Sequence, residues 1–160
     1  MRDLPYNRFA AVAYARRWAL DRNPAFYNFT GIGGDCTNFA SQCIYAGAGI
    51  MNFTPVMGWY YRSARDRTPS WSGVEYLYDF LVNNKSVGPH AHIVSQSEAM
   101  PGDIVQLGTA SGDFYHSPVI TSTEPFILVA AHSDDSLDRP LDSYTYGMSR
   151  FLHIDGVRGW

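Results

Sequence analysis

The sequence lacks several features that would assign it to a common class of protein. It contains no run of Lys or Arg, and its net charge is −3 with a pI near 5.9. This charge balance argues against duplex nucleic acid or an anionic membrane surface as a partner. No apolar stretch approaches the length of a membrane span.

Cysteine is scarce. Cys36 and Cys43 are the two cysteines, and two helical turns would place them roughly 10 Å apart, too far for a disulfide. Cysteine content therefore does not indicate a redox compartment. Residues 1–5 are not followed by the apolar core of a signal peptide. We expect either a cytoplasmic protein or, if it works outside the cell or in the cell envelope, one trimmed from a longer precursor.

Apolar and aromatic residues are abundant. The chain has 160 residues, of which 46% are apolar, and this predicts one globular domain over residues 1–160. Because the chain carries eleven Tyr, nine Phe and four Trp, some rings are expected near the surface, where they could line a cleft. We expect a monomer.

The apolar periodicity changes along the chain from helical to strand-like. Helices are predicted over residues 6–22 and 36–46, and a third is opened by a capping box at Ser72–Glu75 and closed by Asn83 and Asn84. Residues 51–69 are expected to form a long ordered loop with one short strand. Strands are predicted over 103–107, 114–121, 126–131 and 151–154. Helices followed by strands predict an α+β fold, with N-terminal helices packed on an antiparallel sheet.

Cys36 lies in the most informative segment, Gly33-Gly34-Asp35-Cys36-Thr37-Asn38-Phe39. The glycines permit a tight turn, and Asp35 is a suitable N-cap, so Cys36 falls at the first helical position. Free amides and the helix dipole favour a thiolate there, whereas the adjacent Asp35 charge would raise the thiol pKa. We predict that Cys36 is a nucleophile, and that Cys43 is buried in the helix face formed with Phe39, Ala40 and Ile44.

A cysteine nucleophile needs a base and a group that orients the base. His116 lies within one predicted strand and His132 ends the next, and the turn between the strands is centred near Glu124. A hairpin symmetric about Glu124 would oppose the two histidines, with Cβ atoms about 4.5–5.5 Å apart. A slip of one residue would separate them, and Pro118 is a candidate for such an irregularity.

Several motifs resemble those of bacterial cell-wall enzymes. Asp35-Cys36-Thr37-Asn38-Phe39-Ala40 resembles the cysteine motif of NlpC-type peptidases, and Pro101-Gly102-Asp103-Ile104-Val105 resembles a strand shared with CHAP amidases. The order GGDCTNFASQ, GWYY, PGDIVQL, YHSPVIT and VAAHSDD is similar to that of the bacterial putative amidase domain family, over nearly the whole chain.

The resemblance implies a papain-like fold with Cys36 as nucleophile, His116 as general base and His132 as the orienting third residue. Asp134 or Asp135 could take the place of His132. The oxyanion would be held by the Cys36 backbone N–H, with Asn28 or Thr30 as side-chain candidates. The candidate substrate-binding residues are Asp35, Thr37, Trp59, Tyr60, Tyr115 and Ser117.

The implied activity is hydrolysis of an amide or peptide bond through a thioester, with cell-wall peptide as a candidate substrate. An acyltransferase with the same residues and a non-catalytic binding module on the same fold are the alternatives. His90 and His92 could share one strand face, but no Cys or carboxylate lies at ligand spacing. We therefore predict no metal and no cofactor.

Overall fold

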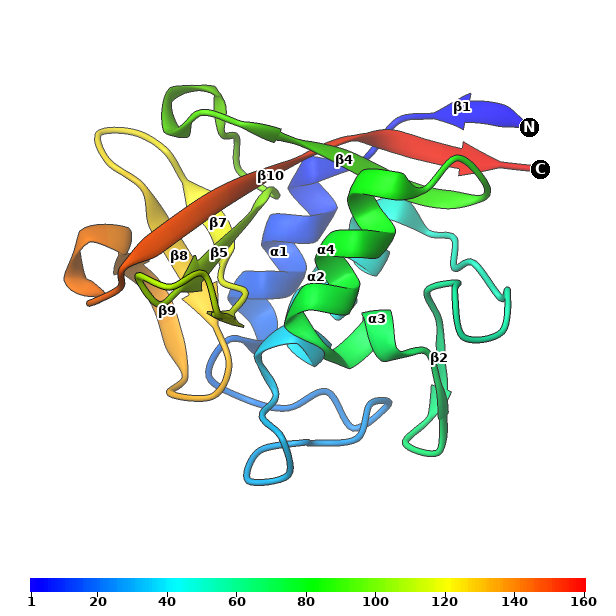
Figure 1. Ribbon diagram of the computed structural model, residues 1–160, viewed down its shortest axis with the longest axis horizontal. Helices are drawn as coiled ribbons and strands as arrows, with labels where there is room; N and C mark the ends of the chain where they lie inside the picture. The colour runs from blue at the N-terminus through cyan, green and yellow to red at the C-terminus, as the bar shows by residue number, and fades with distance from the viewer.

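The computed structural model describes residues 1–160 as a mixed α+β structure, in which a curled antiparallel sheet lies against a group of helices (Figure 1). The helices are α1 (Arg8–Trp18), α2 (Cys36–Ala48), α3 (Pro69–Ser72) and α4 (Val74–Asn83), with short 3-10 helices η1 (Gln96–Glu98) and η2 (Leu141–Ser143). The strands are β1 (Arg2–Leu4), β2 (Tyr61–Ser63), β3 (Asp66–Arg67), β4 (Gly88–Val94), β5 (Ile104–Gly108), β6 (Phe114–His116), β7 (Val119–Ser122), β8 (Leu128–Ala131), β9 (Ser136–Pro140) and β10 (Met148–Gly159). The predicted α+β class, with helices packed on an antiparallel sheet, is confirmed. None of the helices is long and apolar enough to cross a membrane.

Strand β10 organises the main sheet. The strands run in the order β1-β10-β5-β7-β8-β9, while β4 also pairs with β10 and β6 also pairs with β5. Every one of these pairings is antiparallel. The sequence pattern detected only residues 151–154 of β10, and it missed β1, β4 and β9. Two of these missed strands contain proline, which weakens the strand signal.

The sheet buries apolar residues on both faces. Ile104 packs in the larger core beside the helices, whereas its neighbour Val105 packs in a second, smaller core on the other face. The same alternation separates Val119 from Ile120, Ala130 from Val129, and Leu152 from Phe151. The central strands are therefore apolar on both faces.

Helix α1 is shorter than predicted. It begins after Asn7, whose side chain accepts a hydrogen bond from the Ala10 N–H, and it ends at Trp18 rather than Arg22. In a longer helix the Trp18 carbonyl would accept the Arg22 N–H, but here it faces His132 Nε2 at 2.8 Å. The buried residues of α1 are Ala11 and Ala15, joined by Ala19 just beyond its end, whereas Leu20 is exposed.

Helix α2 confirms the sequence pattern most closely. Cys36 is its first residue, and Phe39, Ala40, Cys43 and Ile44 are all fully buried. The helix ends at Gly49, whose positive φ of 71° closes the last turn.

Residues 51–83 depart from the prediction in detail. The expected loop contains the β2–β3 hairpin rather than a single strand. The predicted capping box is wrong, because Ser72 ends α3 and its hydroxyl accepts a hydrogen bond from Arg67. Gly73 is the N-cap of α4 and provides no side-chain cap, although α4 itself lies where predicted.

The predicted strand over 114–121 is divided in two. β6 ends at His116 and β7 begins at Val119, because Pro118 has no N–H to donate to the ladder with β5. β7 pairs with β8 through Val119 opposite Ala130 and Ile120 opposite Val129. This register differs by one residue from a hairpin symmetric about Glu124. The predicted direct opposition of His116 and His132 is therefore wrong.

Candidate active site

The start of α2 places the Cys36 thiol against the backbone of β6. Its sulfur donates to the Tyr115 carbonyl oxygen at 3.8 Å and lies 3.7 Å from Thr37 Oγ1. The Ser117 backbone N–H is hydrogen-bonded to the same sulfur. The thiol is half-buried, and its contacts lie on the two residues that flank His116.

His116 is the last residue of β6 and pairs in register with Leu107 of β5. Its half-buried ring lies 5.7 Å from the ring of Tyr144. Burial, followed by the positive charge of Arg139, lowers the pKa of His116 to about 4, and Asp134 acts in the opposite direction. The imidazole is therefore neutral at neutral pH, as a general base requires.

The Cys36 thiol is also neutral at rest. Burial raises the pKa of Cys36 above its ordinary value, and the Asp35 charge adds to this effect. Hydrogen bonds with Thr37 and with the Ser117 N–H lower the pKa but do not outweigh burial. The thiolate that a helix start would favour is thus not the resting form, and the opposing effect expected from Asp35 is present.

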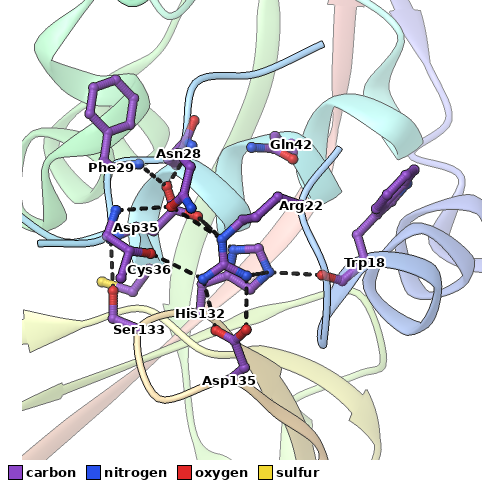
Figure 2. A network of polar contacts seen from close by, with 12 residues as sticks. Trp18, Arg22, Asn28, Phe29, Asp35, Cys36, Gln42, His132, Ser133 and Asp135 are labelled. Atoms are coloured by element: carbon purple, nitrogen blue, oxygen red, sulfur yellow. Dashed lines mark hydrogen bonds and ion pairs between the residues drawn. The ribbon is translucent and has the colours of Figure 1, made fainter. Parts of the chain in front are cut away.

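Asp35 occupies the N-cap position, but its side chain does not cap the helix. The buried carboxylate instead accepts the Phe29 N–H at 2.8 Å and the Asn38 side-chain amide at 2.9 Å (Figure 2). Its Oδ2 lies 2.6 Å from His132 Nδ1. Burial raises the pKa of Asp35, but these hydrogen bonds outweigh it and hold the pKa below its usual value.

His132 is buried beside Asp35 rather than beside His116. Its Nδ1 faces Asp35, its Nε2 faces the Trp18 carbonyl, and its ring stacks on Phe39 with centroids 4.0 Å apart. Both ring nitrogens are therefore occupied away from His116. In Figure 2 the Cys36 sulfur points away from the His132 ring. The predicted orienting contact between His132 and His116 is not formed, because the His132 nitrogens face Asp35 and Trp18, and β6, which carries His116, pairs with β5 and not with β8.

Arg22 links the residues around this histidine. Its two terminal nitrogens each lie 2.9 Å from a carboxylate oxygen of Asp135, and Nη1 lies 3.1 Å from His132 Nε2 (Figure 2). Asp135, one predicted alternative to His132, is therefore engaged by Arg22. Arg22 ends the helix predicted over residues 6–22, and nothing in its local sequence pattern distinguishes it from other surface arginines.

The two predicted oxyanion side chains also bind Arg22. Asn28 Oδ1 accepts from Arg22 Nε at 3.2 Å, and Thr30 Oγ1 accepts from Nη2 at 3.1 Å. Their oxygen atoms therefore point toward the guanidinium group. The Cys36 backbone N–H lies at the helix start beside the thiol, where an oxyanion donor is needed.

Most predicted substrate-binding residues are buried. Asp35, Thr37, Trp59 and Ser117 expose at most 1% of their surface, so they support the site rather than line it. Tyr60 is half-buried, and its hydroxyl donates to Asp66 in the β2–β3 hairpin. Tyr115 is 50% exposed, and its backbone carbonyl is the group that contacts the Cys36 sulfur.

A second polar chain holds β6 and β7 behind the thiol. Thr37 Oγ1 lies 3.2 Å from Ser117 Oγ, which accepts from Gln106 Nε2 at 3.2 Å. Gln106 in turn accepts from Arg150 at 2.8 Å, and Arg150 pairs with Glu75 of α4. The strand carrying His116 is therefore tied to α2, β5, β10 and α4. Sequence reasoning missed Gln106 and Arg150.

His92 and two surface pockets lie apart from Cys36. His92 pairs with Asp155 at 2.7 Å, and no group of three His, Cys, Asp or Glu side chains is arranged to hold a metal ion. One pocket, of about 640 Å³, lies between α4 and the loop around Met57. A second, of about 530 Å³, lies beside Phe126. Neither is lined by Cys36 or His116.

The fold and site describe an α+β protein that presents a helix-start cysteine to a histidine strand. The chain belongs to the putative amidase domain family, which matches residues 5–154. It is similar to the uncharacterized protein YhbB of Bacillus subtilis (strain 168), with 32% identity over 164 residues that cover 96% of this chain and 51% of that protein. The chain thus spans about half the length of this relative. No solved structure matches it. Family membership supports an amidohydrolase activity on an amide substrate.

Proposed function

We propose that this protein is a cysteine amidohydrolase with a papain-like architecture of the NlpC and CHAP type. Cys36 is the nucleophile and His116 is the general base. One observation supports this proposal most directly. The Cys36 sulfur lies between the Tyr115 carbonyl and the Ser117 N–H, and these two residues are on either side of His116. Membership in an amidase family supports the same chemistry.

The reaction begins from a neutral thiol and a neutral imidazole. His116 takes the thiol proton as the sulfur attacks the amide carbonyl, and the Cys36 backbone N–H stabilises the oxyanion. His116 then gives the proton to the leaving amine as the C–N bond breaks, which leaves a thioester on Cys36. A water molecule, deprotonated by His116, attacks the thioester. The acid is released, and the thiol regains its proton.

Asp134 is the better of the remaining candidates for a third residue. Its charge acts on His116 by raising the pKa, which means that the carboxylate favours the imidazolium formed during the reaction. Its side chain is 92% exposed and lies 3.5 Å from Arg139. We therefore expect a modest contribution from Asp134.

The proposed substrate is an amide or peptide bond of peptidoglycan. The thiol lies beside the backbone of Tyr115, whose side chain is exposed, and directly follows the glycine-rich segment that contains the exposed Ile32. Gly31 and Gly33 have open space where a side chain would stand, so a substrate backbone can approach closely there. These features favour an extended peptide over a small ligand enclosed in a cavity.

The test is mass spectrometry of products released from digested cell-wall fragments. We expect Cys36→Ser to lower kcat/KM by at least about a thousandfold, because the hydroxyl is a much weaker nucleophile in this setting. Cys43→Ala is the matched control, since Cys43 lies two turns along the same helix, is fully buried, and should be dispensable for turnover. Equal product formation by wild type and Cys36→Ser would overturn the proposal. Products carrying an added amine would indicate an acyltransferase.

A further inference from the structure

Asp35 and His132 form a buried pair that the proposed reaction does not use. Asp35 exposes 0% of its surface and His132 exposes 1%, and their closest atoms are 2.6 Å apart. The His132 ring nitrogens face Asp35, the Trp18 carbonyl and Arg22. A buried charged group is costly unless it is fully satisfied, so the pair requires an explanation.

The Asp35 carboxylate joins three segments of the chain at the residue before the nucleophile. It accepts the N–H of Phe29, from the start of the glycine-rich segment, and the amide of Asn38, from the first turn of α2. Its contact with His132 reaches the end of β8. The Asp35 N–H donates to Ser133 Oγ at 2.8 Å, which adds a second link to the same strand end.

The far side of the His132 ring is held as firmly. Nε2 faces the Trp18 carbonyl at 2.8 Å, which anchors the ring to the end of α1. The ring stacks on Phe39. Arg22, which is paired with both carboxylate oxygens of Asp135, lies with Nη1 3.1 Å from His132 Nε2. The ring therefore cannot rotate without breaking contacts on both nitrogens and one face.

We propose that Asp35 and His132 are positioning residues that fix the start of α2, and with it the Cys36 sulfur, against β6. The inference rests on the proposed function of Cys36. Asp35 makes no capping hydrogen bond to the helix, and its carboxylate instead ties together α2, β8 and the segment that begins at Phe29. His132 acts on the nucleophile through Asp35, and not on the base His116.

The test compares His132→Asn with His132→Gln. The Asn amide can place its nitrogen near the position of Nδ1 and keep the link to Asp35, whereas the Gln amide reaches the position of Nε2 and keeps only the Trp18 contact. Because a displacement of about 1 Å can cost about a hundredfold in rate, we expect His132→Gln to lower kcat at least about tenfold with KM unchanged. We expect His132→Asn to retain kcat within about threefold of wild type.

Two results would overturn the inference. Equal losses of kcat in both variants would indicate that His132 orients His116, and wild-type kcat in both, with only the thermal midpoint lowered, would indicate a purely structural role. Circular dichroism at the assay temperature confirms that each variant is folded. If His132→Gln does not fold, Asp35→Asn replaces it, with the same expected loss of kcat.

A second measurement separates failure of this inference from failure of the proposed function. If the wild-type protein releases no product, the rate of iodoacetamide labelling at Cys36, resolved by peptide mass spectrometry, replaces kcat, and Cys43 in the same sample is the internal control. The positioning role then predicts an altered Cys36 labelling rate in His132→Gln and a rate near wild type in His132→Asn. Identical rates in the two variants would overturn it, whatever the natural substrate is.

Discussion

At the scale of single residues, the two side chains proposed to react, Cys36 and His116, are both neutral at rest. The thiol has a raised pKa and the imidazole a lowered one, both chiefly through burial. An ion pair between thiolate and imidazolium is therefore not the resting state. In the proposed reaction, proton transfer from Cys36 to His116 accompanies the attack on the substrate, so the rate depends on how closely the sulfur and the ring approach.

The acid limb of the pH profile should reflect His116. Its pKa is about 4, below the 6.5 of an ordinary histidine, so the ring stays neutral and able to accept a proton until the pH falls close to 4. We expect kcat/KM to be retained through pH 6 and to fall near pH 4. Measurement of kcat/KM against pH on a released amine tests this.

Arg139→Gln provides the control for the pH profile. Removing the positive charge that helps to lower the pKa of His116 should move the acid limb to higher pH. In wild type, the free energy of unfolding should fall together with kcat/KM as the pH drops from about 6.5 toward 4. The reason is that the lowered pKa of His116 in the folded state stabilises the protein above about pH 6.5, and this stabilisation is lost toward pH 4. An acid limb near pH 6.5 in wild type would contradict the assignment.

At the scale of elements, the buried carboxylate of Asp103 links helix α1 to strands of the main sheet. Asp103 precedes β5 and is fully buried. It pairs with Arg8 of α1 at 2.7 Å and with His153 of β10 at 2.9 Å, and it accepts the backbone N–H of Ile154. The motif Pro101-Gly102-Asp103 therefore joins α1 to the two strands β5 and β10.

Removing this carboxylate should destabilise the whole protein. We expect Asp103→Ala to lower the free energy of unfolding by about 3–5 kcal/mol, because Arg8 and two backbone N–H groups would lose their partner. Urea denaturation measures the change. Asp113→Ala, at an exposed position in the loop after β5, is the matched control, with an expected change within about 0.5 kcal/mol. Equal effects of the two substitutions would contradict a central role for Asp103.

At the scale of the whole molecule, two hydrophobic cores share one sheet. The larger lies between the sheet and the helices, and the smaller lies on the opposite face, covered by Leu141, Tyr144 and Tyr146. The two cores are separated by only the thickness of β5, β7, β8 and β10, whose alternate residues enter each. We therefore infer that residues 1–160 form one cooperative domain.

A core substitution on the helix side should weaken both cores together. Leu152→Ala should cost about 2–5 kcal/mol, since Leu152 is fully buried in the larger core. Pulsed hydrogen exchange in urea, followed by mass spectrometry, can monitor a peptide from α2 and a peptide from β8 and β9. We expect the two peptides to share one unfolding midpoint in wild type, and to shift together in the variant. Separate midpoints would contradict a single domain.

Local patterns in the sequence determined a definite part of this structure. Turn residues, the change from helical to alternating periodicity and the Gly-Gly-Asp-Cys segment predicted the α+β class, the start and buried face of α2, and Cys36 at the first helical position. These features depend on interactions among residues a few positions apart, which a sequence displays directly.

Only the tertiary structure decided the surroundings of the reactive groups. His132 meets Asp35 across 97 positions and Arg22 meets Asp135 across 113, and the register of β7 with β8 separates His116 from His132 by a shift of one residue. The direction of the Cys36 pKa shift was likewise decided by burial between α2 and β6. Such pairings depend on how distant segments pack and on the dielectric around each charge, and neither is encoded in any short stretch of residues.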